Sequence, residues 1–292
     1  MMPDPARRGS SPATLLLGLV GAGIQASRTP AMHEREAQAH GIPCTYRLFD
    51  LDVLGGSADL LPLLIGAAER AGFAGLNVTH PCKQAVIAHL TALADDARAI
   101  GAVNTVVLRD GARIGHNTDW WAFRESMRRG LPDASLRHVV QLGAGGAGAA
   151  TAYAILKMGA ERLELVDAVP ARAEALARSL DAQFAGRVVA AAPSRDALAA
   201  ATGLIHATPT GMAAHPGMAL PAEWLHEHLW VAEVVYFPLT TALLDAAEER
   251  GCRTLDGAGM AVWQAVEAFR LFTGFAADAE RMRRFFVEAG SR

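Results

Sequence analysis

Cysteine and charge are both scarce in this chain, and each scarcity excludes a class of protein. The three cysteines among 292 residues, Cys44, Cys82 and Cys252, are odd in number and far apart, and no C-x-x-C occurs. This pattern predicts neither a disulfide framework nor a zinc site, and it favours a reducing compartment such as the cytoplasm. Charged residues make up 20% of the chain and the net charge is −3, so we expect no basic surface for nucleic acid or for a membrane.

Long apolar runs are also missing, although one stretch near the N-terminus has two interpretations. No run reaches the ~20 residues that a membrane span needs. Arg7-Arg8 followed by Leu15–Ile24 and Ala26 resembles a secretory signal peptide with its cleavage site. The same run contains glycines and enters a Ser/Thr-Pro turn, as a buried first strand would, so we predict a core strand over 15–20. Residues 1–13 are rich in Pro, Ser and Arg, and we predict that they are disordered.

Strand and helix patterns alternate along the rest of the chain. Strands are predicted at 15–20, 45–50, 75–78, 103–108, 114–116, 137–142, 163–166, 203–207 and 231–236. Helices are predicted at 30–40, 60–71, 119–129, 149–157, 260–271 and 279–288. Such alternation is typical of α/β folds with mostly parallel sheets, and 292 residues are many for one core. We therefore predict two domains: an α/β substrate domain (14–120 with 260–292) and a Rossmann-type dinucleotide-binding domain (121–259).

A G-x-G-x-x-G motif lies at Gly143, Gly145 and Gly148, between a predicted strand and a predicted helix. Only glycine lets a pyrophosphate come this close to the free amides and the dipole of a helix N-terminus. Asp167 follows the next predicted strand, 19 positions after Gly148. A carboxylate there binds the ribose hydroxyls of NAD and repels the 2′-phosphate of NADP. The alternative interpretation is a tight packing contact between a strand and a helix.

Several groups of polar residues follow predicted strands, where ligands gather in open α/β sheets. They are Ser27-Arg28-Thr29, Asn77 to Lys83, Asn104-Thr105 and Asn117-Thr118-Asp119. Each has a structural explanation, because Ser27 or Thr29 before Pro30, and Asn117 or Asp119, are suited to cap helices. Asn104 is equally suited to a turn. The recurrence of such groups at strand ends favours one shared binding site.

Seven segments resemble the signatures of the shikimate dehydrogenase family, and they occur in the family's order over about residues 15–290. They are Gly75–Lys83, Ile100–Thr105, Gly115–Asp119, Gly143–Ala147, Ala207–Met212, Val235–Pro238 and Gln264–Phe269. The resemblance implies that Lys83 and Asp119 are the catalytic pair beside the hydroxyl that is oxidised. An alcohol that loses a hydride must also lose a proton, and a positioned Lys/Asp couple can transfer it.

The resemblance also implies which residues bind substrate and cofactor. Substrate-binding positions are matched by Ser27, Thr29, Asn77, Thr79, Asn104, Tyr236 and Gln264. Cofactor-binding positions are matched by Gly143, Ala144, Gly145, Gly146, Ala147, Asp167, Arg172, Thr208, Met212 and Gly259. No zinc-ligand spacing appears, so no metal is expected.

Departures from the biosynthetic, NADP-using pattern resemble the NAD-using quinate/shikimate dehydrogenase branch. NADP-using members have Asn-Arg-Thr after the second strand of the nucleotide domain, whereas this chain has Asp167-Ala168-Val169-Pro170 and then Arg172. Ser-Arg-Thr-Pro at 27–30 and His215-Pro216-Gly217 resemble the same branch. His206 replaces an asparagine, and we interpret it as a packed or hydrogen-bonded residue at a strand end.

These observations predict an enzyme that reversibly oxidises the 3-hydroxyl of quinate or shikimate with NAD, as a monomer or a homodimer. One alternative is an NADP-linked biosynthetic shikimate dehydrogenase, against which Asp167 argues. A second is an inactive homologue that binds NAD and substrate as a sensor. The intact Lys83 and Asp119, and the lack of any DNA-binding extension, argue against the sensor. The sequence leaves the choice between quinate and shikimate open.

Overall fold

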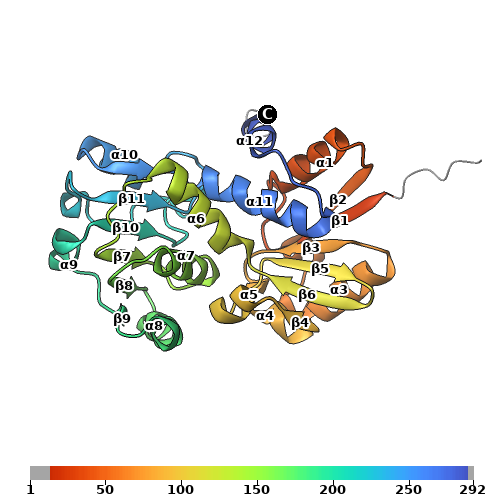
Figure 1. Ribbon diagram of the computed structural model, residues 1–292, viewed down its shortest axis with the longest axis horizontal. Helices are drawn as coiled ribbons and strands as arrows, with labels where there is room; N and C mark the ends of the chain where they lie inside the picture. The colour runs from red at the N-terminus through yellow and green to blue at the C-terminus, as the bar shows by residue number, and fades with distance from the viewer. Residues whose placement is uncertain (1–13, 289–292) are drawn as a thin grey trace, which may run out of the picture.

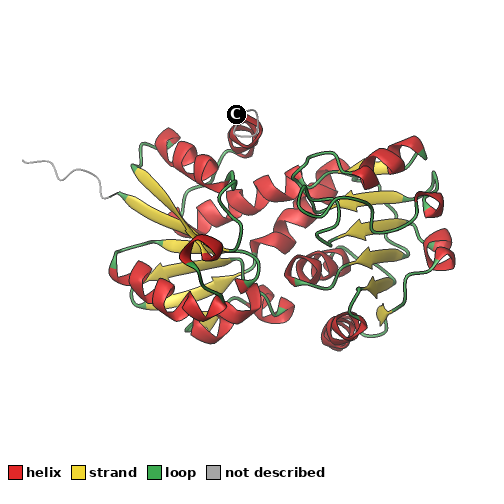
Figure 2. Cartoon of the chain, turned by 180° about the vertical axis from the view of Figure 1, so that it is seen from behind, coloured by secondary structure: helices red, strands yellow, loops and turns green. Residues whose placement is uncertain are grey.

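The computed structural model describes residues 14–288, so the segment 1–13, for which disorder is predicted, lies outside the described part. The described chain forms two six-stranded sheets with helices packed on their faces (Figures 1 and 2). Most neighbouring strands within the two sheets are parallel. The predicted α/β class with mostly parallel sheets is therefore confirmed.

The two sheets are built from separate parts of the chain. The first contains β1 (Leu15–Gly21), β2 (Cys44–Asp50), β3 (Gly75–Val78), β4 (Ala92–Leu93), β5 (Thr105–Arg109) and β6 (Ala112–His116). The second contains β7 (Val139–Leu142), β8 (Leu163–Val166), β9 (Val188–Ala190), β10 (Gly203–His206), β11 (Trp230–Glu233) and β12 (Arg253–Leu255). The helices are α1 (Thr29–Ala39), α2 (Leu51–Leu54), α3 (Leu61–Arg70), α4 (Cys82–Ala85), α5 (Asp95–Ile100), α6 (Thr118–Gly130), α7 (Gly146–Lys157), α8 (Pro170–Phe184), α9 (Arg195–Ala200), α10 (Ala242–Glu249), α11 (Ala258–Thr273) and α12 (Ala279–Glu288).

The first sheet has the order β2-β1-β3-β5-β6-β4. β1 pairs in parallel with β2 and β3, and Leu17 and Val20 on it are fully buried. The apolar run near the N-terminus therefore forms the predicted core strand. β5 and β6 form the predicted antiparallel hairpin, in which Asp110 and Gly111 both have positive φ angles of 52° and 75°. Two positive φ angles are what a two-residue hairpin turn requires.

The second sheet is entirely parallel in the order β12-β11-β10-β7-β8-β9. Counted from β7, this is the order 3-2-1-4-5-6 of a Rossmann fold. The chain reverses direction of winding between β7 and β10, and dinucleotides bind in the crevice at such a switch point, beyond the carboxyl ends of the strands. The loops after β7 and β10 therefore border this crevice.

Helices α6 and α11 join the two halves of the molecule (Figure 1). From α6, Phe123 and Met127 pack into the core around β7 and α7. From α11, Met260 enters that same core, whereas Phe269 packs with α1 and α12 beside the first sheet. Both helices thus fix how the two sheets lie relative to each other. Among residues 14–288, no helix has the length and apolarity needed to cross a membrane.

Some predicted boundaries differ from the structure for identifiable reasons. The strand predicted over 231–236 ends at Glu233, whose carboxylate accepts a hydrogen bond from Val235 N at 2.9 Å and so turns the chain out of the sheet. Strands β4, β9 and β12 were not predicted, because two or three residues are too few to show alternation. Neither Ser27 nor Thr29 caps α1, which begins with Arg28 at the cap position and Pro30 in the first turn.

Candidate active site

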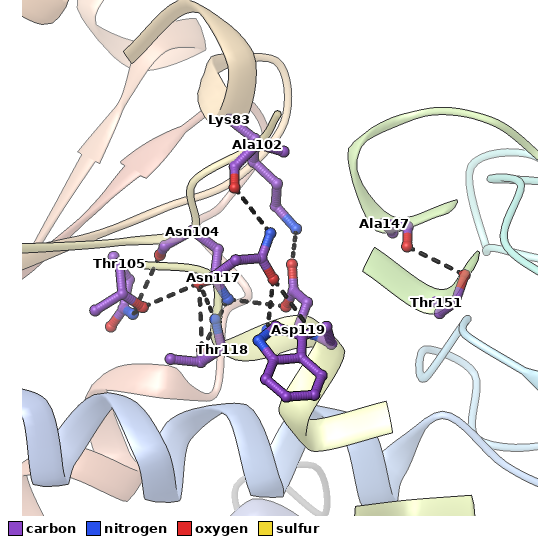
Figure 3. Close-up of polar contacts among 11 residues, drawn as sticks. Lys83, Ala102, Asn104, Thr105, Asn117, Thr118, Asp119, Ala147 and Thr151 are labelled. Carbon is purple, nitrogen blue, oxygen red and sulfur yellow. Dashed lines mark hydrogen bonds and ion pairs between the residues drawn. The ribbon is translucent and has the colours of Figure 1, made fainter. Parts of the chain in front are cut away.

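Lys83 and Asp119 form an ion pair at one edge of the first sheet. Lys83 lies on α4 after β3, and Asp119 lies in the first turn of α6 after β6. β5 lies between β3 and β6 and is antiparallel to both, so β3 and β6 run in the same direction. The ends of β3 and β6 therefore lie beside the start of β5. Lys83 Nζ is 2.6 Å from Asp119 Oδ2, and the two side chains are 17% and 8% exposed (Figure 3).

Asn104, the residue just before β5, fixes the other oxygen of Asp119. Its Nδ2 donates to Asp119 Oδ1 and to Thr118 Oγ1, both at 2.9 Å. Its Oδ1 accepts hydrogen bonds from Thr118 N and from Thr105 Oγ1 (Figure 3). Each carboxylate oxygen of Asp119 therefore has its own donor, and this holds the carboxylate in one orientation toward Lys83.

Asn117 is the residue that caps α6. Its Oδ1 accepts from Asp119 N at 3.1 Å and from Trp120 N at 3.3 Å, and its Nδ2 donates to Ala102 O. The expectation that Asp119 itself caps the helix is wrong, because its carboxylate binds Lys83 and Asn104 instead. Because Asn117 caps the helix, the Asp119 carboxylate can pair with Lys83.

Asn77, on β3, is hydrogen-bonded to the residues that hold Asp119. It is buried, its Oδ1 accepts from Tyr46 Oη at 2.8 Å, and its Nδ2 donates to Thr105 Oγ1 at 3.1 Å and to Asn104 O at 3.4 Å. Both the oxygen and the nitrogen of the Asn77 amide therefore have hydrogen-bond partners within the protein. In this arrangement Asn77 supports Asn104 and Thr105, which in turn hold Asp119.

The hydroxyl residues expected to bind the substrate follow β1 and β3. Ser27 and Thr79 lie on loops, and Thr29 is the first residue of α1. Thr79 N donates to Val20 O at the end of β1, and Gly21 lies against the Thr79 methyl group. Ser27 Oγ accepts from Thr29 N at 3.3 Å. Within residues 14–288, the hydroxyls of Thr29 and Thr79 have no hydrogen-bond partner, and both residues are partly exposed. Both hydroxyls are therefore available to a ligand.

Tyr236 follows β11 of the second sheet, and Gln264 lies on α11. Tyr236 is 43% exposed, but burial of its phenol raises its pKa, on which the charges of Lys83, Asp119 and Arg28 also act. Its hydroxyl therefore lies within electrostatic range of the pair. Gln264 lies partly exposed on α11, which packs along α6, the helix that carries Asp119.

The three glycines of the motif after β7 differ in what surrounds them. Gly143 has a φ of 101°, and a Cβ there would stand 2.5 Å from Ala207 O. Gly148 lies against the carbonyl of Gly143, so that α7 packs closely on the turn. A Cβ at Gly145 would meet no protein atom within 4 Å, which leaves open space in front of the N-terminus of α7. That space fits a pyrophosphate bound to the helix amides.

Two buried side chains missed by sequence reasoning support this turn. Gln141 Nε2 donates to Gly143 O at 2.9 Å and to Gly148 O at 2.8 Å. Thr151 Oγ1 on α7 donates to Gln141 Oε1 at 2.9 Å. The only available signal was a glutamine at an otherwise apolar strand position immediately before the glycines.

Asp167, directly after β8, contacts the glycine-rich turn. Its Oδ2 accepts from Ala144 N and its Oδ1 from Val169 N, both at 2.8 Å. The residue is partly exposed, and each oxygen retains a second lone pair for a ribose hydroxyl. Arg172 lies exposed in the first turn of α8, and its backbone N–H donates to Val169 O.

The other expected cofactor residues lie on the far side of the switch point and on α11. Thr208 follows β10, and its Oγ1 is 2.6 Å from His206 Nε2. Met212 is exposed and lines a cavity of about 300 Å³ together with Phe237 and Thr241. Gly259 lies in the first turn of α11, where a Cβ would stand 2.9 Å from Ser126 Oγ on α6. Gly259 therefore also serves the close packing of these two helices.

The two parts of the site touch each other. The aliphatic part of the Lys83 side chain packs against Gly146, the first residue of α7. A lysine paired to a carboxylate thus stands beside the helix N-terminus of a Rossmann-type turn. Fold and site together are those of a dinucleotide-dependent oxidoreductase.

Comparisons with known proteins specify this class further. Residues 19–106 match the shikimate dehydrogenase substrate binding domain, and residues 257–284 match the shikimate 5′-dehydrogenase C-terminal domain. The chain is 58% identical over 270 residues to a shikimate dehydrogenase (NADP(+)) of Streptomyces avermitilis, covering 91% of this chain and 93% of that protein. It is 48% identical over 278 residues to a quinate/shikimate dehydrogenase (NAD(+)) of Corynebacterium efficiens, covering 94% and 98%.

A solved structure agrees with these sequence matches. Quinate dehydrogenase from Corynebacterium glutamicum in complex with NAD superposes with a TM-score of 0.89 at 47% identity, covering 94% of this chain and 99% of that one. The chain belongs to the shikimate dehydrogenase family and is an oxidoreductase of the shikimate/quinate dehydrogenase type.

Proposed function

We propose that this enzyme reversibly oxidises the 3-hydroxyl of quinate, shikimate or both to the 3-dehydro ketone, with NAD as the hydride acceptor. The observation that carries the cofactor assignment is the carboxylate of Asp167 at the end of β8, hydrogen-bonded to Ala144 N of the glycine-rich turn. A carboxylate there is matched to the two ribose hydroxyls of NAD and repels the additional phosphate of NADP. The likeness to NAD(+)-named relatives supports the same assignment.

Bound NAD supplies the carbon atom that accepts the hydride, and the protein's own residues handle the proton. Lys83 and Asp119 are the proposed catalytic pair, since Nζ and Oδ2 lie 2.6 Å apart and the pair faces Gly146. The substrate hydroxyl proton passes to this pair as the hydride leaves, and returns from it in the reverse reaction. Asn104 holds Asp119 so that its carboxylate remains directed at Lys83.

The remaining polar side chains at the same sheet edge are proposed to orient the ring. Ser27 and Thr29 are assigned to the substrate carboxylate, with Thr79, Tyr236 and Gln264 at the ring hydroxyls or the carboxylate. The partnerless hydroxyls of Thr29 and Thr79 support this, because a ligand would give them the hydrogen bonds they lack among residues 14–288. Asn77 is assigned to the ring hydroxyls or the carboxylate as well, and its amide also supports Asn104 and Thr105.

We also propose how the chain divides into domains and in which oligomeric state the enzyme acts. Residues 14–120 with 260–292 form the substrate domain, and 121–259 form the NAD-binding domain. The enzyme acts as a monomer or a homodimer in the cytoplasm, on small molecules alone. Lys83, Asp119 and the supporting Asn104 all come from one chain, which supports a site that needs no partner residue.

Steady-state kinetics with quinate and shikimate, each with NAD and with NADP, test the proposal. We expect the highest kcat/KM with NAD for at least one of the two substrates. An NADP-linked shikimate dehydrogenase is the second candidate, favoured by the 58% identity to an NADP(+)-named relative. It would show its highest kcat/KM with shikimate and NADP. Absence of turnover in all four combinations would identify a sensor that binds ligands without catalysis.

A further inference from the structure

A buried histidine and a buried glutamate form a pair at the carboxyl end of the second sheet. His206 is the last residue of β10 and Glu233 the last residue of β11, and the two lie level in the register of these strands. They are 1% and 2% exposed. His206 Nδ1 lies 2.9 Å from both Glu233 Oε1 and Glu233 Oε2. The prediction that His206 is a hydrogen-bonded residue at a strand end is confirmed. Its hydrogen-bond partners also fix the orientation of the imidazole ring.

The hydrogen bonds of Glu233 determine which way the imidazole faces. Val235 N donates to Oε1 at 2.9 Å and Thr241 Oγ1 donates to Oε2 at 3.0 Å. The carboxylate can only accept, so His206 Nδ1 carries a proton toward it. The opposite nitrogen, Nε2, is thereby directed at Thr208 Oγ1, 2.6 Å away. The imidazole links Glu233 to Thr208.

Thr208 lies at the switch point of the Rossmann sheet. His206 is level with Leu142, the residue before Gly143, and a Cβ at Gly143 would stand 3.1 Å from Thr208 N. Thr208 therefore borders the glycine-rich turn from the other side of the crevice in which dinucleotides bind. Thr210 N also donates to its hydroxyl at 3.2 Å.

We propose that His206 and Glu233 are positioning residues that hold the Thr208 hydroxyl in the orientation in which it hydrogen-bonds the dinucleotide. A hydroxyl rotates freely unless a partner fixes it, and fixing it beforehand removes an entropic cost from binding. This inference rests on the proposed function in taking NAD(H) as the ligand of the crevice. Glu233 acts through His206, and His206 acts through Thr208.

Replacing His206 by asparagine or by glutamine tests the contacts of its two ring nitrogens separately. The amide of asparagine replaces Nδ1 and keeps the bond to Glu233, but it is too short to reach Thr208. The amide of glutamine extends as far as Nε2 and keeps the bond to Thr208. We expect His206→Asn to raise the Kd for NADH about three- to tenfold, the loss of one hydrogen bond, and His206→Gln to restore most of the affinity.

A second histidine–glutamate pair in the same domain provides the control. His138 Nε2 lies 3.1 Å from Glu164 Oε1 just before β7 begins, at the amino end of the sheet and away from the crevice. His138→Asn removes a comparable contact, so it reports the cost of disturbing such a pair in general. We expect it to change the melting temperature without changing the Kd for NADH.

Fluorescence titration with NADH of the wild type, His206→Asn, His206→Gln, Thr208→Val and the double variant His206→Asn/Thr208→Val tests the proposal. If His206 acts through Thr208, adding His206→Asn to Thr208→Val has no further effect on the Kd. The KM for the polyol substrate should stay within about twofold. Two results would overturn the proposal. In the first, the increases in Kd of the two single variants multiply in the double variant; in the second, His206→Asn and His138→Asn change the Kd for NADH equally. Should the wild type prefer NADP, the same ratios measured with NADPH keep this test separate from the cofactor assignment.

Discussion

The side chain of Lys83 packs against the α-carbon of Gly146. A Cβ at position 146 would stand 3.2 Å from Lys83 Cδ and 3.5 Å from Lys83 Cβ. Lys83 lies on α4, which follows β3 of the first sheet, and Gly146 begins the helix that follows the glycine-rich turn. The ion pair and the cofactor turn are therefore in direct contact, and the missing side chain at 146 leaves room for the lysine.

Replacing Gly146 tests this contact. We expect Gly146→Ala to shift Lys83 relative to Asp119 and to lower kcat about 10- to 100-fold, because small displacements of reacting groups are costly. The melting temperature should not fall, since alanine favours helices over glycine. Gly145→Ala is the matched control, because a Cβ there meets no protein atom and enters only the proposed pyrophosphate space. It should raise the Kd for NADH and leave the fold intact. A wild-type kcat for Gly146→Ala would contradict this account.

The proposed proton transfer is tested by Lys83→Ala. We expect kcat to fall at least ~10²-fold with a much smaller change in the Kd for substrate, because a general acid-base group is lost. The only other lysine of the chain, Lys157, ends α7 with Nζ 5.8 Å from the ring centre of Tyr153. Lys157→Ala should therefore retain wild-type kcat. Near-normal turnover of Lys83→Ala would remove Lys83 from the mechanism.

Thr29→Val separates substrate binding from helix capping. A hydrogen bond to a charged group is worth about 1.5–3 kcal/mol, so the KM for quinate or shikimate should rise about 10- to 150-fold. The hydroxyl of Thr29 has no partner among residues 14–288 and does not cap α1, so the melting temperature should stay unchanged. Thr91→Val removes an exposed hydroxyl bonded to Arg113 N near the start of β6, at the opposite end of that strand from Asp119, and is a control that should leave the KM unaffected. An unchanged KM together with a fall in melting temperature would make Thr29 a structural residue.

The sequence was sufficient for those parts of the site that depend on local order. The glycine-rich turn could be predicted because strand, glycines and helix follow one another, and its two strained or crowded glycines are explained by contacts within a few residues or with Ala207. The pair of Lys83 and Asp119 came from the resemblance to a family. Its geometry depends on strand direction, because the hairpin of β5 and β6 returns Asp119 to the edge where β3 ends.

Contacts set by strand register could not be predicted. His206 and Glu233 are 27 residues apart and meet only because β10 and β11 pair in a register that places both at the same level. Asn77 stays predicted to bind the substrate, but its hydrogen bonds to Tyr46 and Thr105 depend on where β2 and β5 lie and could not be read from the sequence. A polar residue at a strand end looks the same in the sequence whether it faces a ligand or another side chain.

His33 gives the fold a dependence on pH. It is fully buried beside Tyr46 and Phe269, neither ring nitrogen has a hydrogen-bond partner among residues 14–288, and burial lowers its pKa from 6.5 to about 3. Between these two values the unfolded chain binds a proton that the folded chain does not. His33 therefore contributes stability that is present above pH 6.5 and is lost as the pH falls toward 3.

Urea unfolding of the wild type and of His33→Phe at pH 7.5 and pH 5 measures this effect. The wild type should lose about 2 kcal/mol more of its free energy of unfolding than the variant between the two pH values, because 1.5 pH units below 6.5 correspond to about that energy. Comparing the two proteins cancels the other groups that titrate over this range. An equal loss in both would show that His33 is protonated in the folded state or that it exchanges with solvent.

Cofactor choice is tested at Asp167, whose two oxygens accept from Ala144 N and Val169 N beside the glycine-rich turn. With NADP the carboxylate would face a phosphate of nearly two negative charges, and such repulsion typically costs several kcal/mol. We therefore expect the wild type to favour NAD at least ~10²-fold in kcat/KM.

Asp167→Ser should erode most of this preference, chiefly by improving the use of NADP, because a serine hydroxyl removes the charge and can still accept one of the two backbone hydrogen bonds. Arg172, exposed in the first turn of α8, is then available to the phosphate. Asp181→Ser is the matched control, since Asp181 also accepts a backbone hydrogen bond, from Gly186 N, but lies near the other end of α8. It should leave the ratio of the two specificity constants unchanged. Equal use of NAD and NADP by the wild type, or an unchanged ratio in Asp167→Ser, would refute the assignment of Asp167 as the residue that selects NAD.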